Sequence, residues 1–354
     1  MSTDMEEALQ EQVTTAAADG TQLNITGGDT KSFLGRNPQG SPLDVTGHTG
    51  ILSYEPKELV ITARCGTPLT EIENALREQG QMLAFEPPHF GHEATLGGTI
   101  AAGLSGPRRP YTGSARDFVL GTRILTGRGE ILRFGGEVMK NVAGYDISRL
   151  MTGAMGTLGV ILDVSLKVLP IPAKEITLVQ SRGHEDALQA VNKWAGSPIP
   201  LSAACSDGER LYIRLSGAAT AVSSAQEIIG GELMEDGNSF WTDRIREQGH
   251  AFFKGDTPLW RISVPASTSF DKLPGKCLID WGGGLRWLMS DVDHRIIQDT
   301  ATTAGGHATL FRGGDRQGNV YQDLPKPLMT IQQNLKRAFD PQGLFNPGRM
   351  YPEL

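Results

Sequence analysis

The chain has 354 residues, a formal net charge of −7, 39% hydrophobic residues and 21% charged residues. This length suits two domains of about 150 residues each, and the composition is that of a globular protein rather than a disordered or fibrous one. The negative charge argues against nucleic acid as a partner, and no run approaches the roughly 18 apolar residues of a membrane-spanning helix.

The N-terminal half alternates between expected helices and strands. Residues 4–18 form an amphipathic pattern that Asp4 and Glu7 would open as a capping box. The pattern then predicts a strand at 23–25, a buried strand at 59–63, a helix from Thr67 to Gly80, a hairpin of 118–126 with 131–134, and a strand at 160–168. This half is therefore mixed α and β.

The segment 169–174 contains two prolines and is the expected domain boundary. Beyond it, strands are expected near 176–180, 211–215, 259–264 and 285–289, with helices near 185–195, 219–229, 239–248, 292–303 and 328–339. The five tryptophans all lie beyond this boundary. The C-terminal half therefore reads as a second α+β module.

Glycine loops are the main functional signal. Residues 27–32 follow a strand and can form a nest of backbone N–H groups around a phosphate, although an ordinary turn is an equal alternative. The loop lacks the order of a P-loop. Thr95-Leu96-Gly97-Gly98 is expected to start a short helix whose N–H groups point at an anion. No G-x-G-x-x-G follows a strand, which excludes a Rossmann dinucleotide site.

Five blocks in this order resemble the FAD-binding domain of the vanillyl-alcohol oxidase and p-cresol methylhydroxylase (PCMH) superfamily. They are Gly27-Gly28-Asp29-Thr30, Thr95-Leu96-Gly97-Gly98, Gly144-Tyr145-Asp146 with Leu150, the segment 153–161, and Asn346-Pro347-Gly348. Nearly the whole chain, including segments 106–110, 134–141 and 278–283, resembles the FAD-binding subunits of bacterial glycolate oxidases.

The resemblance implies an α+β fold with three parts. Residues 1–170 would form a PCMH-type FAD-binding domain of two α+β subdomains, and residues 171–325 an α+β cap domain with an antiparallel sheet. Residues 326–354 would form a C-terminal helix and tail that return to the flavin.

The resemblance also implies which residues bind FAD. The pyrophosphate would lie on Gly27, Gly28, Asp29, Thr30, Lys31 and Ser32, with Thr95, Leu96, Gly97, Gly98 and Gly103 completing the clamp. The remaining contacts would come from Ser114, Arg116, Asp117, Gly156, Thr157, Gly159, Val160 and Asn346. Many relatives attach the flavin to a histidine in the first loop; this loop has none, so we expect non-covalent FAD.

No catalytic acid/base pair is apparent, and we expect no metal. The three cysteines lie far apart, which argues against a disulfide framework, a zinc site and an iron–sulfur cluster. The histidines His184, His250, His294 and His307 are scattered, and His89 and His92 are best explained as surface residues. The polar residues left as candidates for the flavin ring or a substrate carboxylate are Arg108, Arg109, Lys140 and Tyr145.

The function that the resemblance implies is that of an FAD-binding subunit in a glycolate oxidase or dehydrogenase complex. It would oxidise glycolate and other short 2-hydroxy acids, giving glyoxylate from glycolate, and pass electrons to a second FAD-containing subunit and an iron–sulfur subunit. The acidic N-terminus predicts a cytoplasmic protein that reaches the inner face of a membrane only through partners. Two alternatives remain: an assembly subunit with structural FAD, and a stand-alone flavin reductase.

Overall fold

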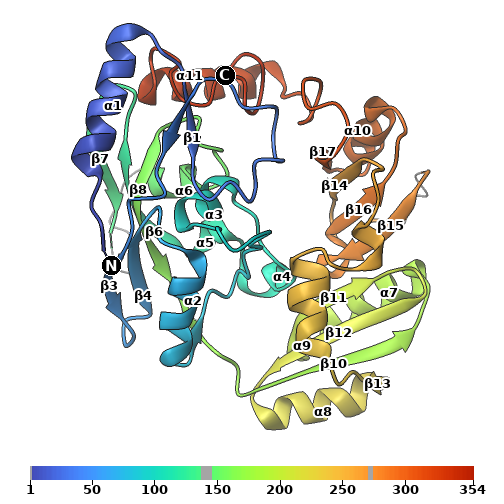
Figure 1. The fold of residues 1–354 in the computed structure, drawn as a ribbon. Coiled ribbons are helices and arrows are strands. Elements are labelled where there is room, and N and C mark those ends of the chain that lie inside the picture. Colours follow the sequence, from blue (N-terminus) through green and yellow to red (C-terminus); the bar gives the residue numbers. More distant parts are fainter. Residues whose placement is uncertain (1, 137–145, 270–273) are drawn as a thin grey trace.

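The structure is a computed structural model that describes residues 2–136, 146–269 and 274–354. It places one antiparallel sheet in the N-terminal half and a larger one in the C-terminal half (Figure 1). The elements before the boundary segment are α1 (Glu6–Asp19), β1 (Leu23–Thr26), β2 (Ser41–Asp44), β3 (Ile51–Glu55), β4 (Val60–Arg64), α2 (Leu69–Glu78), β5 (Gln81–Met82), α3 (Leu96–Ala102), α4 (Arg109–Thr112), α5 (Ala115–Phe118), β6 (Val119–Leu125), β7 (Ile131–Gly135), α6 (Ile147–Leu150) and β8 (Val160–Lys167).

The N-terminal sheet has the order β3-β4-β8-β6-β7, and all its pairs are antiparallel. The predicted hairpin is present as β6 and β7, and the predicted strand at 160–168 is β8, whose residues are buried along nearly its whole length. Two-stranded pairings of β1 with β2 and of β5 with β9 (Leu169–Pro170) complete this half. The α+β prediction is confirmed.

Helices α1 and α2 present regularly spaced apolar residues to the N-terminal core. In α2 the buried residues are Leu69, Ile72 and Leu76, which share one helix face. The capping box expected for α1 was wrong: the helix begins after Met5 without a side-chain cap. Asp4 instead accepts a hydrogen bond from the Glu6 N–H and forms an ion pair with Arg64.

The C-terminal half contains β10 (Lys174–Ser181), α7 (His184–Ala195), β11 (Leu201–Ser206), β12 (Arg210–Gly217), α8 (Ala219–Ile229), β13 (Glu232–Leu233), α9 (Gly237–Ser239), the π-helix η1 (Phe240–Arg246), the 3₁₀ turn η2 (Ala251–Phe253), β14 (Leu259–Ser263), β15 (Lys276–Asp280), the 3₁₀ turn η3 (Trp281–Gly283), β16 (Leu285–Met289), α10 (His294–Thr303), β17 (His307–Arg312) and α11 (Lys326–Phe339). The helix expected at 239–248 is therefore largely a π-helix.

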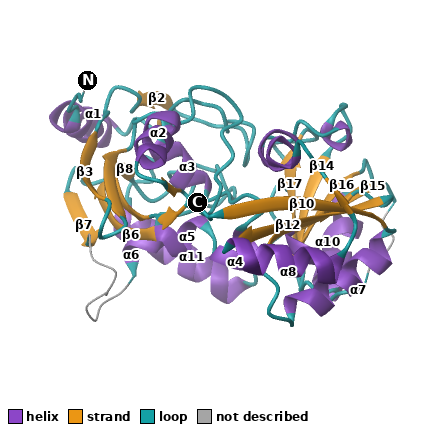
Figure 2. Cartoon of the chain, turned by 90° about the horizontal axis from the view of Figure 1, so that it is seen from below, coloured by secondary structure: helices purple, strands orange, loops and turns teal. Residues whose placement is uncertain are grey.

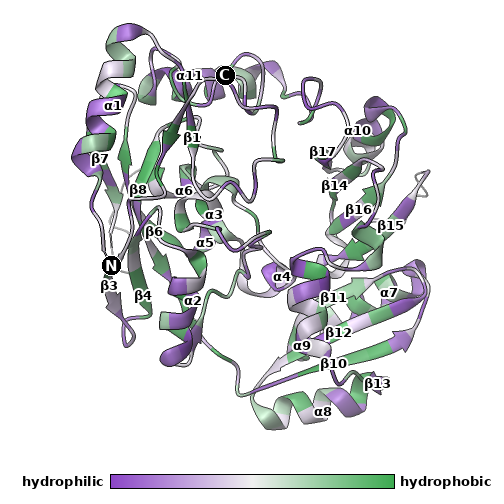
Figure 3. Cartoon of the chain, viewed as in Figure 1, coloured by the Kyte–Doolittle hydropathy of each residue, from purple (hydrophilic) through white to green (hydrophobic). Residues whose placement is uncertain are grey.

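These strands form one antiparallel sheet of order β13-β10-β12-β11-β15-β16-β14-β17. Helices α7, α8 and α10 cover one face of it (Figure 2). Its strands carry much of the hydrophobic character of this half (Figure 3). Of the described helices, none is long and apolar enough to cross a membrane.

The other face of this sheet packs against the N-terminal half. A hydrophobic cluster joins Trp287 and Phe311 of the sheet to Leu34, Phe90 and Leu104. The rings of Trp287 and Phe311 lie 4.8 Å apart in an edge-to-face arrangement. The two halves therefore share a continuous apolar cluster.

The C-terminal tail after α11 crosses back to the N-terminal half. The Asn346 N–H donates to the Leu23 carbonyl at 2.8 Å, and the Lys336 ammonium donates to the carbonyls of Thr157 and Phe345. Asp340 accepts hydrogen bonds from Lys336 and from the Phe345 N–H. These bonds place Asn346 beside β1.

Candidate functional site

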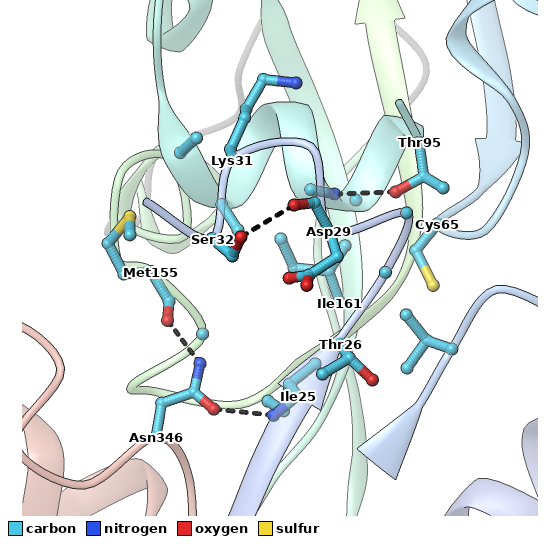
Figure 4. A pocket seen from close by; sticks show the side chains of 18 of the residues that line it. Ile25, Thr26, Asp29, Lys31, Ser32, Cys65, Thr95, Met155, Ile161 and Asn346 are labelled. Atoms are coloured by element: carbon cyan, nitrogen blue, oxygen red, sulfur yellow. Dashed lines mark hydrogen bonds between the residues drawn. The ribbon is translucent and has the colours of Figure 1, made fainter. Parts of the chain in front are cut away.

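The glycine cleft is a hollow in the N-terminal half where the loop after β1, helix α3, the loop before β8 and the C-terminal tail meet. It encloses about 890 Å³ including its mouth, a size typical of ligand pockets. Twelve of the predicted cofactor-binding residues line it: Gly27, Gly28, Asp29, Thr30, Lys31, Ser32, Thr95, Gly97, Gly98, Gly156, Gly159 and Asn346. Figure 4 shows how several of these residues surround the hollow.

The loop 27–32 exposes a row of backbone donors. Among the described residues no acceptor is bound to the N–H of any residue from 27 to 31, whereas the Ser32 N–H and hydroxyl both reach the Asp29 carbonyl. Asp29 has a φ of 55°, so the loop turns through the left-handed region. Successive free N–H groups in such a turn form a concave site for an anion.

Gly28 lets this loop lie directly against the neighbouring backbone. A Cβ at this position would lie 1.4 Å from the carbonyl oxygen of Glu93. Any side chain here would therefore push the loop out of place, which gives a structural reason for glycine at this position.

Helix α3 forms another wall of the glycine cleft, and the prediction that its first N–H groups point at an anion was wrong. The short helix exists and Thr95 caps it, but its first N–H groups are occupied by protein acceptors: Leu96 donates to the Thr67 carbonyl, Gly97 to the Cys65 carbonyl and Gly98 to the Thr95 hydroxyl. Gly97 and Gly98 of α3 therefore line the cleft without side chains, but their N–H groups are not available to an anion.

The third wall combines the segment before β8 with the tail. The Asn346 side chain accepts from the Ile25 N–H at 2.7 Å and donates to the Met155 carbonyl at 2.6 Å (Figure 4). Met155, Gly156 and Asn346 all have positive φ. Left-handed backbone at non-glycine residues concentrates at functional sites, and here two such residues face the same hollow as Asp29.

Several lining residues were missed by the sequence analysis. They are Asn24, Ile25, Thr26, Pro38, Val45, Cys65, Ala101, Ala102, Met155, Ile161 and Arg349, most of them apolar. Arg349 follows the predicted Asn346 in the tail and donates to the Ser32 carbonyl at 2.8 Å. The apolar residues gave no signal of their own because their spacing is that of ordinary core strands and helices.

Lys31 places a cation beside the loop. Burial lowers the pKa of its ammonium to about 8, opposed by the charge of Glu247. The ammonium donates to the Thr30 hydroxyl and to the His89 carbonyl at 3.1 Å. Lys31 is thus fixed at the edge of the cleft rather than free in solvent.

Seven predicted cofactor-binding residues do not line this cleft: Leu96, Gly103, Ser114, Arg116, Asp117, Thr157 and Val160. Leu96, Thr157 and Val160 are buried in the core, and Gly103 ends α3 with a φ of 63°. Ser114 and Asp117 form the capping box of α5, and Arg116 is exposed on that helix. Each of these residues has a structural role or position away from the hollow.

Two of the four catalytic candidates, Arg108 and Arg109, make contacts with other side chains of the protein. Arg108 is bound by Glu86 at 3.1 Å and by Glu175 at 2.6 Å, which contradicts the expectation that it binds a substrate carboxylate. Arg109 lies over the ring of Trp281, 4.3 Å from its centroid. Lys140 and Tyr145 lie outside the described residues.

The ion pairs of Arg108 belong to a buried network between the two halves. Burial would raise the pKa of Glu86, but Arg214 and Arg108 outweigh it and lower that pKa. Arg214 lies 2.9 Å from Glu86, and the Ser216 hydroxyl donates to Glu175. The network joins the segment 86–108 to strands β10 and β12, so it is a structural connection.

The residues of the glycine cleft suit a long anionic cofactor with an aromatic ring. Five free amides offer donors for phosphate oxygens, while Ile25, Val45 and Ile161 give an apolar surface. No histidine lines the cleft within the described chain. The same portion of the chain contains no cluster of His, Cys, Asp and Glu that would bind a metal.

Comparisons with known proteins agree with this geometry. Residues 3–135 match the FAD binding domain family. The p-cresol methylhydroxylase structure with substrate bound superposes with a TM-score of 0.72, covering 99% of this chain and 88% of that one at 15% identity. An alkyldihydroxyacetonephosphate synthase gives 0.67, covering 96% of this chain and 75% of that one at 15% identity. The fold is therefore that of PCMH-type FAD proteins.

Sequence relatives are more specific. D-lactate dehydrogenase of Anaerostipes hadrus is 33% identical over 141 residues, which cover 40% of this chain and 29% of that protein. The glycolate oxidase subunit GlcE of Escherichia coli (strain K12) is 52% identical over 351 residues, which cover 99% of both chains. This chain belongs to the family of glycolate oxidase subunit GlcE.

Proposed function

We propose that this chain is the FAD-binding subunit of an enzyme complex that oxidises glycolate, and that it binds FAD without a covalent bond in the glycine cleft. The observation that carries the proposal is the row of five free amides at 27–31 in a cleft otherwise lined by glycine and apolar residues. The identity to a glycolate oxidase subunit over nearly the whole chain supports the substrate.

The chain's own residues would bind and orient the cofactor. The amides of 27–31 would take the pyrophosphate, Lys31 would add positive charge, and Asn346 would fix the tail against Ile25 and Met155. FAD supplies two-electron oxidation of an alcohol carbon when it is bound. Because none of the described residues that line the cleft is a histidine, the flavin should be released when the protein is denatured.

The domain division follows the two sheets. We take residues 1–170 as the FAD-binding domain, 171–325 as the cap and 326–354 as the returning tail, since the eight-stranded sheet begins with β10 and α11 leads back to β1. The partners in this proposal are a second FAD-containing subunit and an iron–sulfur subunit, and the location is the cytoplasm, with membrane contact through those partners.

Flavin release tests the cofactor part of this proposal. The purified chain should be yellow, and acid precipitation should leave the flavin in the supernatant, where its absorbance spectrum identifies it. Colour that remains in the pellet would contradict the non-covalent site. A folded, colourless chain that takes up no added FAD would contradict the cofactor proposal itself.

A second test separates an electron-carrying flavin from a structural one. The chain is co-expressed with the glycolate oxidase partner subunits, and glycolate-dependent dye reduction is compared between the wild type and Gly98→Val. We expect the variant complex to assemble but to lose FAD and activity. Full activity in an assembled complex whose Gly98→Val subunit carries no FAD would favour the assembly role.

A further inference from the structure

A second cleft lies between the two halves of the molecule and is separate from the glycine cleft. We call it the arginine cleft; it encloses about 360 Å³. The N-terminal half contributes Pro88, Phe90 and 104–107, and the cap contributes Ile245, Arg246, Gln248, Arg261, Asp280, Leu285, Trp287 and Phe311. Its walls are thus mostly apolar, with a few polar side chains, which is the usual composition of a small-molecule site.

Arg261 is the unusual residue in this cleft. It projects from β14, and within the described chain its guanidinium has no hydrogen-bond or ion-pair partner, only the ring of Trp281 at 5.0 Å from the centroid. The other guanidinium on that ring, from Arg109, adds positive charge nearby. Burial, reinforced by the charge of Arg109, lowers the pKa of Arg261 to about 10.

Arg261 is half-buried and lines the cleft, where its guanidinium can offer up to five hydrogen-bond donors to a ligand. The buried arginines of the neighbouring network show the contrast: Arg108 and Arg214 both bind Glu86. Arg246 also lines the cleft, and its Nε lies 2.9 Å from Oε1 of Glu247. Arg261 therefore has a full set of donors available for a planar anion such as a carboxylate.

Asp280 supplies a matching acceptor. It ends β15, is 3% exposed, and its one hydrogen bond in the described chain is from the Trp281 N–H at 2.7 Å. No cation of the described residues lies within ion-pairing distance of it. Burial raises the pKa of Asp280 to about 7, so near neutral pH the carboxyl group is present in both its protonated and its ionised form.

We propose that the arginine cleft binds a small 2-hydroxycarboxylate, with the carboxylate on Arg261 and the hydroxyl hydrogen bonded to Asp280. The choice of a 2-hydroxy acid over other carboxylates rests on the function proposed above. The apolar side chains of Phe90, Trp287 and Phe311 would contact the carbon atoms of the ligand. The cleft adjoins the cofactor site in sequence, because Ala101 and Ala102 line the glycine cleft and Leu104 and Ser105 line this one.

Glycolate binding tests the proposal directly. Glycolate is titrated into the purified full chain with its FAD, and tryptophan fluorescence is followed, because Trp281 contacts Arg261 and Trp287 lines the cleft. We expect saturable binding that weakens at least tenfold in Arg261→Gln and less in Arg261→Lys. Arg210→Gln, which removes an exposed arginine at the start of β12, should bind as the wild type does.

Acetate tests the hydroxyl contact, because it lacks that group. The wild type should bind glycolate at least tenfold more tightly than acetate, and Asp280→Asn should reduce this preference to a few-fold while keeping the acceptor for the Trp281 N–H. An unchanged preference in Asp280→Asn would overturn the role of that residue.

The absorbance of bound FAD shows whether a failed test counts against the glycolate site or against the FAD site. A yellow chain that binds no glycolate, or binds it equally well in Arg261→Gln, overturns the arginine site and leaves the cofactor proposal standing. A chain that takes up no FAD overturns the cofactor proposal, while its glycolate titration still decides the arginine site. Equal FAD content in all variants shows that the substitutions left the fold intact.

Discussion

The glycine cleft and the arginine cleft differ in which part of the chain faces the ligand. In the first, the donors are backbone N–H groups of 27–31, exposed because glycine allows close approach. In the second, the proposed contacts are side chains on separate strands of the cap: Arg261 would donate and Asp280 would accept. A backbone site suits a cofactor common to a whole fold, whereas a side-chain site can be changed residue by residue to select a substrate.

The two clefts also differ in how they are assembled. The glycine cleft lies within the N-terminal half and is completed by the tail through Asn346. The arginine cleft exists only when the two halves are joined, and the ion network of Arg108 with Glu86 and Glu175 lies at that junction. Trp281 adds a second link, since its indole N–H donates to the Gly106 carbonyl at 2.9 Å.

The largest expected effect comes from breaking this junction. Arg108→Ala leaves Glu86 with one cationic partner and Glu175 with less compensation, and removal of one member of a buried ion pair costs about 3–5 kcal/mol. Chemical denaturation should show a loss of that size. The exposed pair Arg244 with Asp236 is the control, because Arg244→Ala should cost less than about 1 kcal/mol. Similar losses in both variants would mean that the network does not stabilise the junction.

The next effect concerns the glycine cleft alone. Gly98 lines the hollow, and a Cβ there meets only the Thr95 hydroxyl at 3.2 Å, so Gly98→Val should leave the fold intact and obstruct FAD. If overpacking against the cofactor costs the usual amount, about 1–3 kcal/mol, FAD affinity should fall by roughly 5- to 150-fold. Titration of FAD into the deflavinated chain measures it.

Substitutions at two other glycines serve as controls for the FAD titration. Gly183→Val, at the start of α7, has no neighbour closer than 3.9 Å and should bind FAD normally. Gly97→Ala should instead lower the stability of the fold, because its Cβ would lie 2.6 Å from the Cβ of Cys65. If Gly98→Val binds FAD as tightly as Gly183→Val, the cofactor does not occupy this hollow.

A smaller, pH-dependent effect is expected in the arginine cleft. Burial raises the pKa of Asp280 from 3.8 to about 7, with Glu86 adding to the rise and Arg214 and Arg261 opposing it. The folded chain then binds a proton more tightly than the unfolded chain, so this group lowers stability as pH rises from about 4 to about 7.

Asp280→Asn cannot titrate and should gain stability relative to the wild type across that window. Urea denaturation at pH 5 and pH 8 should show the gain increasing by roughly 2 kcal/mol. The measurement is made without added carboxylate, which would bind the wild type. Parallel stability curves for the two proteins would mean that Asp280 titrates as an ordinary carboxyl.

The two clefts also differ in how well they could be predicted from the sequence. The glycine cleft was predictable because its motifs are local: residues 27–32 and 95–98 each carry their geometry in a few consecutive residues. The arginine cleft was not, since nothing in the segment around Arg261 distinguishes it from any strand with one charged residue. Only the sheet order places β14 and β15 on either side of β16.

The errors in the fold have the same origin. Strands β11 and β15 were missed because their small or mixed residues show no clear alternation, and tertiary pairing alone defines them. The donors of α3 were predicted to face a ligand, but acceptors from Cys65 and Thr67, distant in sequence, occupy them. Arg108 was misread because its partners Glu86 and Glu175 lie far away in the chain.

One measurement tests the separation of the two clefts most directly: calorimetric titration of FAD and of glycolate into the wild type, Gly98→Val and Arg261→Gln. The glycine cleft and the arginine cleft share no lining residue. We therefore predict that Gly98→Val loses FAD affinity and that Arg261→Gln keeps it, while Arg261→Gln alone loses glycolate affinity when FAD is present at saturation. Loss of FAD affinity in Arg261→Gln, with Gly98→Val unaffected, would contradict the assignment of both clefts.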